Sequence, residues 1–161
     1  MILVTLGTQD KKFYRILEYI QELINRKVIK EEVIVQAGVS SDFKSNNMKI
    51  VDLLPMEEFD SLISKCDVLI THGGVGSIIT GLKNNKKVIA IARLKKYGEH
   101  VNDHQLQIIS NFVSEGYILS FNSCEELEEN IKKIDKFKPK KYKENNNNFI
   151  KLLKNEIDKY F

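Results

Sequence analysis

The stretch Val68-Leu69-Ile70-Thr71-His72-Gly73-Gly74-Val75-Gly76-Ser77 decides the fold of this chain. Its apolar, β-branched start predicts a buried strand over residues 68–71, and the residues after it predict a helix over 76–84. Glycine lets a backbone approach a ligand closely, and a helix start offers free N–H groups that suit phosphate. Ser77 adds a hydroxyl donor. On spacing alone, however, a tight turn without a ligand is the stronger interpretation.

The pattern on both sides of this stretch is an alternation of short apolar runs and longer amphipathic ones. Strands are expected over 2–6, 33–36, 49–53, 87–92 and 117–120. Helices are expected over 12–26, from Pro55 onward, over 101–115 and after Ser123, where Glu126 completes a capping box. Strands separated by helices predict an α/β fold, with a Rossmann-like parallel sheet flanked by helices on both faces.

Length and composition predict one globular domain with an unusual C-terminal end. The chain has 161 residues, of which 42% are hydrophobic and 29% charged. We expect a domain over 1–135, a linker over 136–148 that contains four consecutive asparagines, and a C-terminal helix over 149–161 as a docking element. Cys66 and Cys124 lie in unrelated segments, which favours two free thiols in a reducing cytoplasm.

Charge is distributed unevenly along the chain. Residues 132–161 hold ten lysines against four acidic residues, so the rest of the chain is slightly acidic although the whole carries +3. A basic patch confined to a tail argues against nucleic-acid binding. The tail suits an anionic lipid or an acidic partner, and a merely solvated helix is an equally good interpretation. No signal-peptide pattern follows Met1, and the uncharged stretch 68–82 is too short to span a bilayer.

Three familiar site types do not fit the glycine-rich stretch or the histidines. The dinucleotide fingerprint requires its glycines after the first strand, and a Walker loop requires lysine where Leu82 stands. His100 and His104 are four residues apart on one expected helix face, but Val101 occupies the position of the general base in the metalloprotease pattern. No third ligand is evident, so we expect no metal site.

Three motifs in the correct order resemble one family. They are Val4-Thr5-Leu6-Gly7-Thr8-Gln9, Thr71-His72-Gly73-Gly74-Val75-Gly76-Ser77 and Gly98-Glu99-His100-Val101-Asn102-Asp103-His104-Gln105. Together, over roughly residues 1–120, they resemble the C-terminal, donor-binding half of the family 28 glycosyltransferases, which have the GT-B fold. Within that group the chain is most similar to PssE-type bacterial exopolysaccharide and capsule proteins. It also resembles the catalytic subunit of the eukaryotic two-chain dolichol-linked GlcNAc transferase.

The resemblance implies a heteromeric enzyme. The chain would bind a UDP-sugar, and a membrane-associated PssD-type subunit would bind a lipid-diphosphate-linked sugar acceptor. It would therefore be cytoplasmic and peripheral at the inner face of the plasma membrane. A non-catalytic subunit that stabilises a partner glycosyltransferase is the alternative.

The same resemblance implies roles for individual positions. Gly7 and Thr8 would face the diphosphate and acceptor, and uracil would rest near residues 54–56. His104 and Gln105 would reach sugar or ribose hydroxyls. The diphosphate would be held by the glycine-rich stretch, at His72, Gly73, Gly74, Gly76 and Ser77.

One position departs from the family pattern. Thr80 stands where relatives often carry a glutamate that holds both ribose hydroxyls, and one hydroxyl does not replace a carboxylate as an acceptor.

The implied chemistry is an inverting displacement that requires no metal or other cofactor. Charge on the departing UDP would be met by the helix start and by cations, with Arg93 a candidate at a strand end. Glu99 and His100 are the candidates within this chain for the general base. In relatives, the general base often lies in the acceptor-binding half.

Overall fold

The computed structural model describes residues 1–144 and 147–159 and contains a parallel sheet of six strands with the order β3-β2-β1-β4-β5-β6. The strands are β1 (Ile2–Thr5), β2 (Val33–Gln36), β3 (Met48–Val51), β4 (Val68–His72), β5 (Lys87–Ile91) and β6 (Leu119–Ser120). The α-helices are α1 (Tyr14–Asn25), α2 (Met56–Lys65), α3 (Val75–Lys83), α4 (His104–Ser114), α5 (Cys124–Lys133) and α6 (Asn147–Asp158). Short 3₁₀ turns are η1 (Gly38–Ser40), η2 (Lys95–Tyr97) and η3 (Ile134–Lys136). The expected α/β, Rossmann-like class is confirmed.

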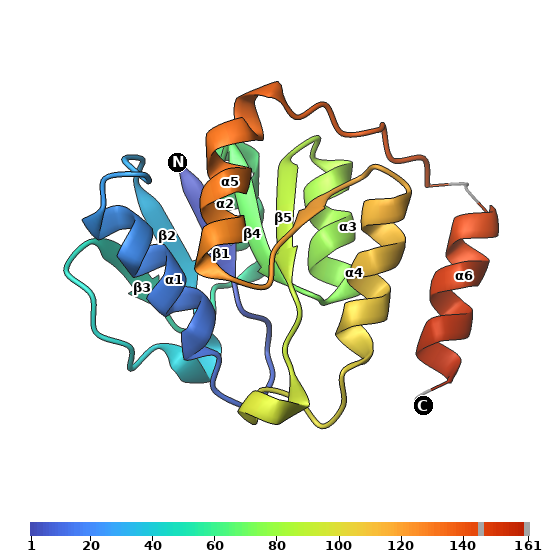
Figure 1. Ribbon diagram of the computed structural model, residues 1–161, viewed down its shortest axis with the longest axis horizontal. Coiled ribbons are helices and arrows are strands. Elements are labelled where there is room, and N and C mark those ends of the chain that lie inside the picture. Colours follow the sequence, from blue (N-terminus) through green and yellow to red (C-terminus); the bar gives the residue numbers. More distant parts are fainter. Residues whose placement is uncertain (145–146, 160–161) are drawn as a thin grey trace.

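Helices cover both faces of the sheet, and two separate cores result (Figure 1). Successive residues of a strand point to opposite faces. Thus Ile2 and Val4 of β1 pack under α1 and α5, while Leu3 packs into the second core, to which α2, α3, α4 and α6 contribute. Because both faces are buried, the strands read as continuous apolar runs.

The strand order changes direction between β1 and β4. From β1 the chain builds outward to β2 and β3, and it then returns to the other side of β1 with β4, where Thr5 lies opposite Thr71. Open α/β sheets bind ligands in the crevice beyond the carboxyl ends of the strands at such a switch point. The glycine loop, defined as residues 73–77, follows β4 at this place.

Several expected boundaries were wrong, and one error affects the site. The helix expected over 101–115 begins only at His104, because Asn102 Oδ1 accepts from the amide of His104 and Asp103 Oδ1 accepts from that of Lys95. His100 therefore lies in a loop, and the expectation that it shares a helix face with His104 was wrong. The third strand ends at Val51, and the last is limited to Leu119–Ser120.

Residues 136–144, which were expected to form part of a linker, make specific contacts with the domain. The amide of Lys140 donates to the carbonyl of Gly116, and the ring of Tyr142 lies 5.5 Å from that of Tyr117. Helix α6 begins at Asn147, within the expected linker, and it packs on α4 (Figure 1). The expected linker residues 145–146 and helix residues 160–161 lie outside the described part of the chain.

Helix α6 buries two of its apolar residues within the domain, whereas Ile150 on the same helix is exposed. Phe149 and Leu153 are 3% and 5% exposed, and Phe149 stacks edge-on against Phe112 at 5.0 Å. Its proposed role in docking therefore does not rest on these two residues. Among residues 1–144 and 147–159, no helix combines the length and the apolar character needed to cross a bilayer.

Candidate functional site

A pocket of about 440 Å³ opens at the switch point, beyond the carboxyl ends of β1, β2, β3 and β4. One wall is apolar and the other carries hydroxyl groups and backbone. Its lining residues are Thr5, Gly7, Thr8, Gln36, Leu53, Leu54, Met56, Phe59, Asp60, Gly76, Ser77 and Thr80. The structure thus brings Gly7 and Thr8 of the first expected motif together with Gly76 and Ser77 of the second. No residue of the third motif, 98–105, lines this pocket.

The start of α3 forms the polar wall of this pocket. No side chain caps the helix, whose N-cap is Gly74, and the first backbone bond back to it comes from the amide of Ile78. The amides of the first turn therefore have no partner within the helix, and the helix dipole places positive potential there. A Cβ added at Gly76 would meet nothing within 4 Å, so the backbone there is open to a ligand.

The ring of His72 separates two of the expected glycines. A Cβ at Gly7 would lie 2.6 Å from its Nε2 atom, and a Cβ at Gly74 would overlap the same atom. Gly7 also has φ +74°, which L side chains rarely adopt. Burial, together with the nearby charge of Arg93, lowers the pKa of His72 to about 4. The imidazole is therefore neutral near neutral pH, and both glycines are required by its position.

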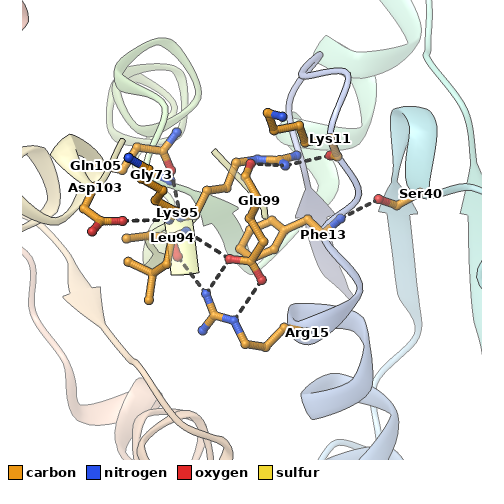
Figure 2. A network of polar contacts seen from close by, with 12 residues as sticks. Lys11, Phe13, Arg15, Ser40, Gly73, Leu94, Lys95, Glu99, Asp103 and Gln105 are labelled. Carbon is orange, nitrogen blue, oxygen red and sulfur yellow. Dashed lines mark hydrogen bonds and ion pairs between the residues drawn. The ribbon is translucent and has the colours of Figure 1, made fainter. Parts of the chain in front are cut away.

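Gln105 ties the glycine loop to the end of β5. Its Oε1 atom accepts from the amide of Gly73 at 3.2 Å and from that of Arg93 at 3.0 Å (Figure 2). A Cβ at Gly73 would lie 2.7 Å from the Cβ of Gln105, so only glycine fits at this contact. Gln105 is 5% exposed and does not line the pocket described above. The expected contact of Gln105 with a sugar remains a prediction, whereas its contact with the loop is observed.

Arg93 lies inside the domain and does not line the pocket. It is 1% exposed, and its guanidinium donates to the carbonyls of Leu6, Lys11 and Glu99 at 2.6–3.2 Å. Burial lowers the pKa of Arg93 to about 10, so the group remains charged at neutral pH. The structure does not place Arg93 where the departing UDP was expected, because both of its terminal nitrogens donate to the chain's own carbonyls and its Nε atom is buried without a partner among the described residues.

The carboxylate of Glu99 is also engaged in contacts within the chain. Its carboxylate forms a bidentate ion pair with Arg15 at 2.8 and 3.0 Å and accepts from the amide of Leu94 at 3.0 Å (Figure 2). The Glu99 side chain is 4% exposed. A carboxylate so engaged does not face a substrate hydroxyl, and this placement argues against Glu99 as the general base.

The other two histidines do not line the pocket: His100 lies in the loop before α4, and His104 is the first residue of α4. Their ring centroids are 6.1 Å apart. Burial lowers the pKa of both, reinforced by the charge of Arg93 for His100 and by His100 for His104. In the part of the chain that the structure describes, no three histidine, cysteine or acidic side chains are grouped as metal ligands.

Thr80 lines the pocket, but its hydroxyl donates to the carbonyl of Gly76 at 2.8 Å.

The pocket-lining residues that the sequence did not predict are Thr5, Gln36, Leu53, Phe59 and Asp60. Thr5 and Gln36 are the last residues of their strands, a position that could have identified them. Phe59 and Asp60 lie one turn after Met56 on α2, so helical spacing offered a signal for these two.

Residues 1–159 match the family described as the glycosyltransferase family 28 C-terminal domain. The UDP-N-acetylglucosamine transferase subunit ALG13 of Candida albicans is 30% identical over 100 residues, which are 62% of this chain and 32% of that protein. The ALG13 subunit of Cryptococcus neoformans var. neoformans serotype D is 28% identical over 102 residues, 63% of this chain and 50% of that one. The chain thus spans a third to a half of the length of these relatives.

Solved structures show the same fold. A glycotransferase of kitacinnamycin covers 96% of this chain, which spans 37% of it, with a TM-score of 0.62 and 15% identity. An NMR structure of ALG13 matches over 94% of both chains, with a TM-score of 0.57 and 19% identity. Methanocaldococcus jannaschii UDP-GlcNAc 2-epimerase covers 99% of this chain, 45% of its own length, with a TM-score of 0.60 and 17% identity.

Proposed function

Because this chain belongs to the glycosyltransferase family 28 C-terminal domain family, we propose that it binds the donor in a two-component inverting glycosyltransferase. It takes a UDP-sugar and acts with a second subunit, which binds a lipid-linked sugar acceptor. The relatives named above are themselves described as subunits of a UDP-N-acetylglucosamine transferase. We place the reaction in bacterial exopolysaccharide or capsule synthesis, with a membrane-associated PssD-type partner that holds the chain at the inner face of the plasma membrane.

The observation that carries the proposal is the two-sided pocket at the start of α3. Its apolar wall of Leu53, Leu54, Met56 and Phe59 offers a surface for a planar base. Across from it, the uncapped amides of α3 and the hydroxyl of Ser77 suit a diphosphate. A volume of about 440 Å³ lies within the range of small-molecule sites.

The pocket also supports the need for a partner. Asp60 is the only ionisable side chain among the residues that line it, and Glu99 is held by Arg15. The general base that activates the acceptor hydroxyl is therefore expected from the second subunit. The start of α3 stabilises the charge on the departing UDP, and the proposed reaction requires no metal.

The central test is calorimetry of UDP binding to the purified chain and to a Gly76→Val variant. A Cβ at residue 76 meets no atom within 4 Å and Gly76 lines the pocket, so the variant is expected to fold and to lose UDP binding. Ser114→Val, at the exposed end of α4, is the matched control and is expected to bind as the wild type does. Equal UDP affinity in Gly76→Val and wild type contradicts the proposed donor site.

Reconstitution separates this proposal from a stabilising, non-catalytic subunit. We expect little sugar transfer by either subunit alone and restored transfer on mixing, with Gly76→Val inactive in the mixture. If the partner alone binds UDP and the Gly76→Val complex retains full activity, the chain is a non-catalytic subunit. The observation that keeps this second function in view is that Glu99, a candidate for the general base, is held by Arg15 and does not line the pocket.

A further inference from the structure

Two buried threonines connect His72 to the centre of the sheet. Thr5 and Thr71 lie opposite each other on β1 and β4, and their hydroxyl oxygens are 2.9 Å apart. Thr71 Oγ1 is also 3.4 Å from Nδ1 of His72. Thr5 is 2% exposed and Thr71 is fully buried. A chain of three polar groups thus runs from β1 to the imidazole that separates Gly7 from Gly74.

The neutral imidazole of His72 has one N–H group, which can be at either ring nitrogen. Since the pKa of His72 is lowered to about 4 by burial and by the charge of Arg93, the neutral ring carries a proton on Nδ1 or on Nε2, not on both. If Nδ1 carries it, this atom donates to the carbonyl of Thr5, also 3.4 Å away. If Nε2 carries it, Nδ1 accepts from Thr71.

Counting hydroxyl hydrogens distinguishes the two arrangements. When Thr5 donates to Thr71 and Thr71 donates to Nδ1, both buried hydroxyl hydrogens are used within the chain of contacts. When Nδ1 donates to the carbonyl, Thr71 has only Thr5 Oγ1 as an acceptor among its contacts, and the hydrogen of Thr5 is left for solvent. Buried hydroxyls are strongly favoured to be hydrogen-bonded, so the first arrangement is preferred.

We infer that Thr71 is a positioning residue that fixes His72 in the Nε2–H form, so that a neutral donor faces an anionic ligand beside Gly7 and Gly74. Nε2 is the ring atom nearest to a Cβ built at either glycine. Gly74 is the N-cap of α3, and Gly7 lines the pocket together with the first turn of that helix. An Nε2 lone pair would repel a phosphate oxygen, whereas an Nε2–H donates to it. This inference deepens the proposed function and rests on it for the identity of the ligand.

The first measurement concerns the free protein and needs no ligand. In nitrogen-15 spectra of the imidazoles at neutral pH, the protonated and unprotonated ring nitrogens resonate far apart. The His72 signals are assigned by their loss in His72→Gln. We expect Nε2–H in the wild type and in Thr71→Ser, and Nδ1–H in Thr71→Val. Nδ1–H in the wild type overturns the inference, as does an unchanged form in Thr71→Val.

Thr5→Val is the matched control, because it makes the same change in an equally buried place. Without the Thr5 hydroxyl, Thr71 still donates to Nδ1, so His72 is expected to keep the Nε2–H form. If Thr5→Val and Thr71→Val alter the tautomer alike, the effect reflects disturbed packing and the inference fails.

The second measurement is UDP affinity. Losing a directed donor to an anionic oxygen is expected to weaken binding about tenfold or more in Thr71→Val, with Thr71→Ser close to wild type. Thr71 is fully buried and does not line the pocket, so lost direct contact does not account for such a change. Unchanged affinity in Thr71→Val overturns the inference. If the wild type binds no UDP, the proposed function fails, while the tautomer result stands independently.

Discussion

Two loops follow neighbouring strands at the same edge of the sheet and differ in their charge and in whether they line the pocket. The glycine loop follows β4, has no charged side chain, and places Gly76 and Ser77 in the pocket. The charged loop, residues 93–100, follows β5 and carries Arg93, Lys95, Lys96 and Glu99, none of which lines that pocket. In the charged loop, Arg93 and Glu99 are buried inside the domain, whereas Lys95 and Lys96 are exposed to solvent.

The difference follows from where each loop finds its hydrogen-bond partners. The terminal nitrogens of Arg93 donate to backbone carbonyls, and the carboxylate of Glu99 is held by Arg15 and by the amide of Leu94, because buried charges are paired or hydrogen-bonded. No side chain of the glycine loop caps the amides at the start of α3, so these amides are left for a ligand. Free backbone groups are therefore a better sign of a binding surface here than charged residues are. Three measurements test this contrast.

The largest expected effect is on stability, at the charged loop. Glu99→Ala removes a nearly buried carboxylate and leaves Arg15 without its partner, which is expected to cost about 3–5 kcal/mol of unfolding free energy. Urea unfolding measures it, with Glu129→Ala, exposed on α5, as a control expected within about 0.5 kcal/mol. UDP affinity of the folded Glu99→Ala fraction should be retained. A variant of wild-type stability that loses UDP binding would place Glu99 in the site after all.

A smaller effect is expected from pH, through His72. The folded-state pKa of about 4 lies below the ordinary value of 6.5, so between these values the unfolded chain binds more protons. The contribution of His72 is complete above about pH 6.5 and is lost as the pH falls toward 4, by up to about 3 kcal/mol. His100 and His104 act in the same direction, since the pKa of each is lowered.

Unfolding free energies measured across this range in wild type and His72→Gln isolate the histidine. We expect a shallower pH dependence in the variant. Identical slopes would mean that the His72 ring is not buried as a neutral group.

The smallest expected effect compares two glycines two residues apart. Gly74→Ala forces a Cβ against the His72 ring and is expected to cost about 1–3 kcal/mol. Gly76→Ala meets nothing and replaces a helical glycine, so it is expected to be neutral or to stabilise by up to about 1 kcal/mol. Thermal or urea unfolding measures both. Equal costs at the two positions would remove the distinction between a glycine needed for packing and one left open.

The sequence predicted the fold class and the glycine loop because both depend on local patterns. The apolar run of Val68–Ile70 and the glycines after it predict a strand followed by a turn from fewer than about ten consecutive residues. The roles of Arg93 and Glu99 depend on Leu6 and Arg15, 87 and 84 positions away. No local pattern indicates whether a charged side chain meets such a partner, which is why both were expected to face the ligand.

The lining of the pocket was predicted in part by residue type and in part by resemblance. Gly76 and Ser77 follow from the strand-to-helix turn, whereas the wall near Leu54 and Met56 was implied only by the family. The tie from Gln105 to Gly73 joins segments 32 positions apart, and a sequence alone does not give the orientation of that amide.

The position of the His72 ring affects which amino-acid substitutions this site tolerates, and in which order. Residues 7, 72 and 74 share one small volume, so the effect of a substitution at residue 74 depends on what stands at residue 72. A larger residue at 74 is damaging while the imidazole is present and becomes acceptable once a smaller residue replaces it. Residue 7 gains less from such a replacement, since its positive φ still favours glycine. A replacement of His72 by a smaller residue is therefore expected to precede any replacement of Gly74, and the reverse order passes through a destabilised protein.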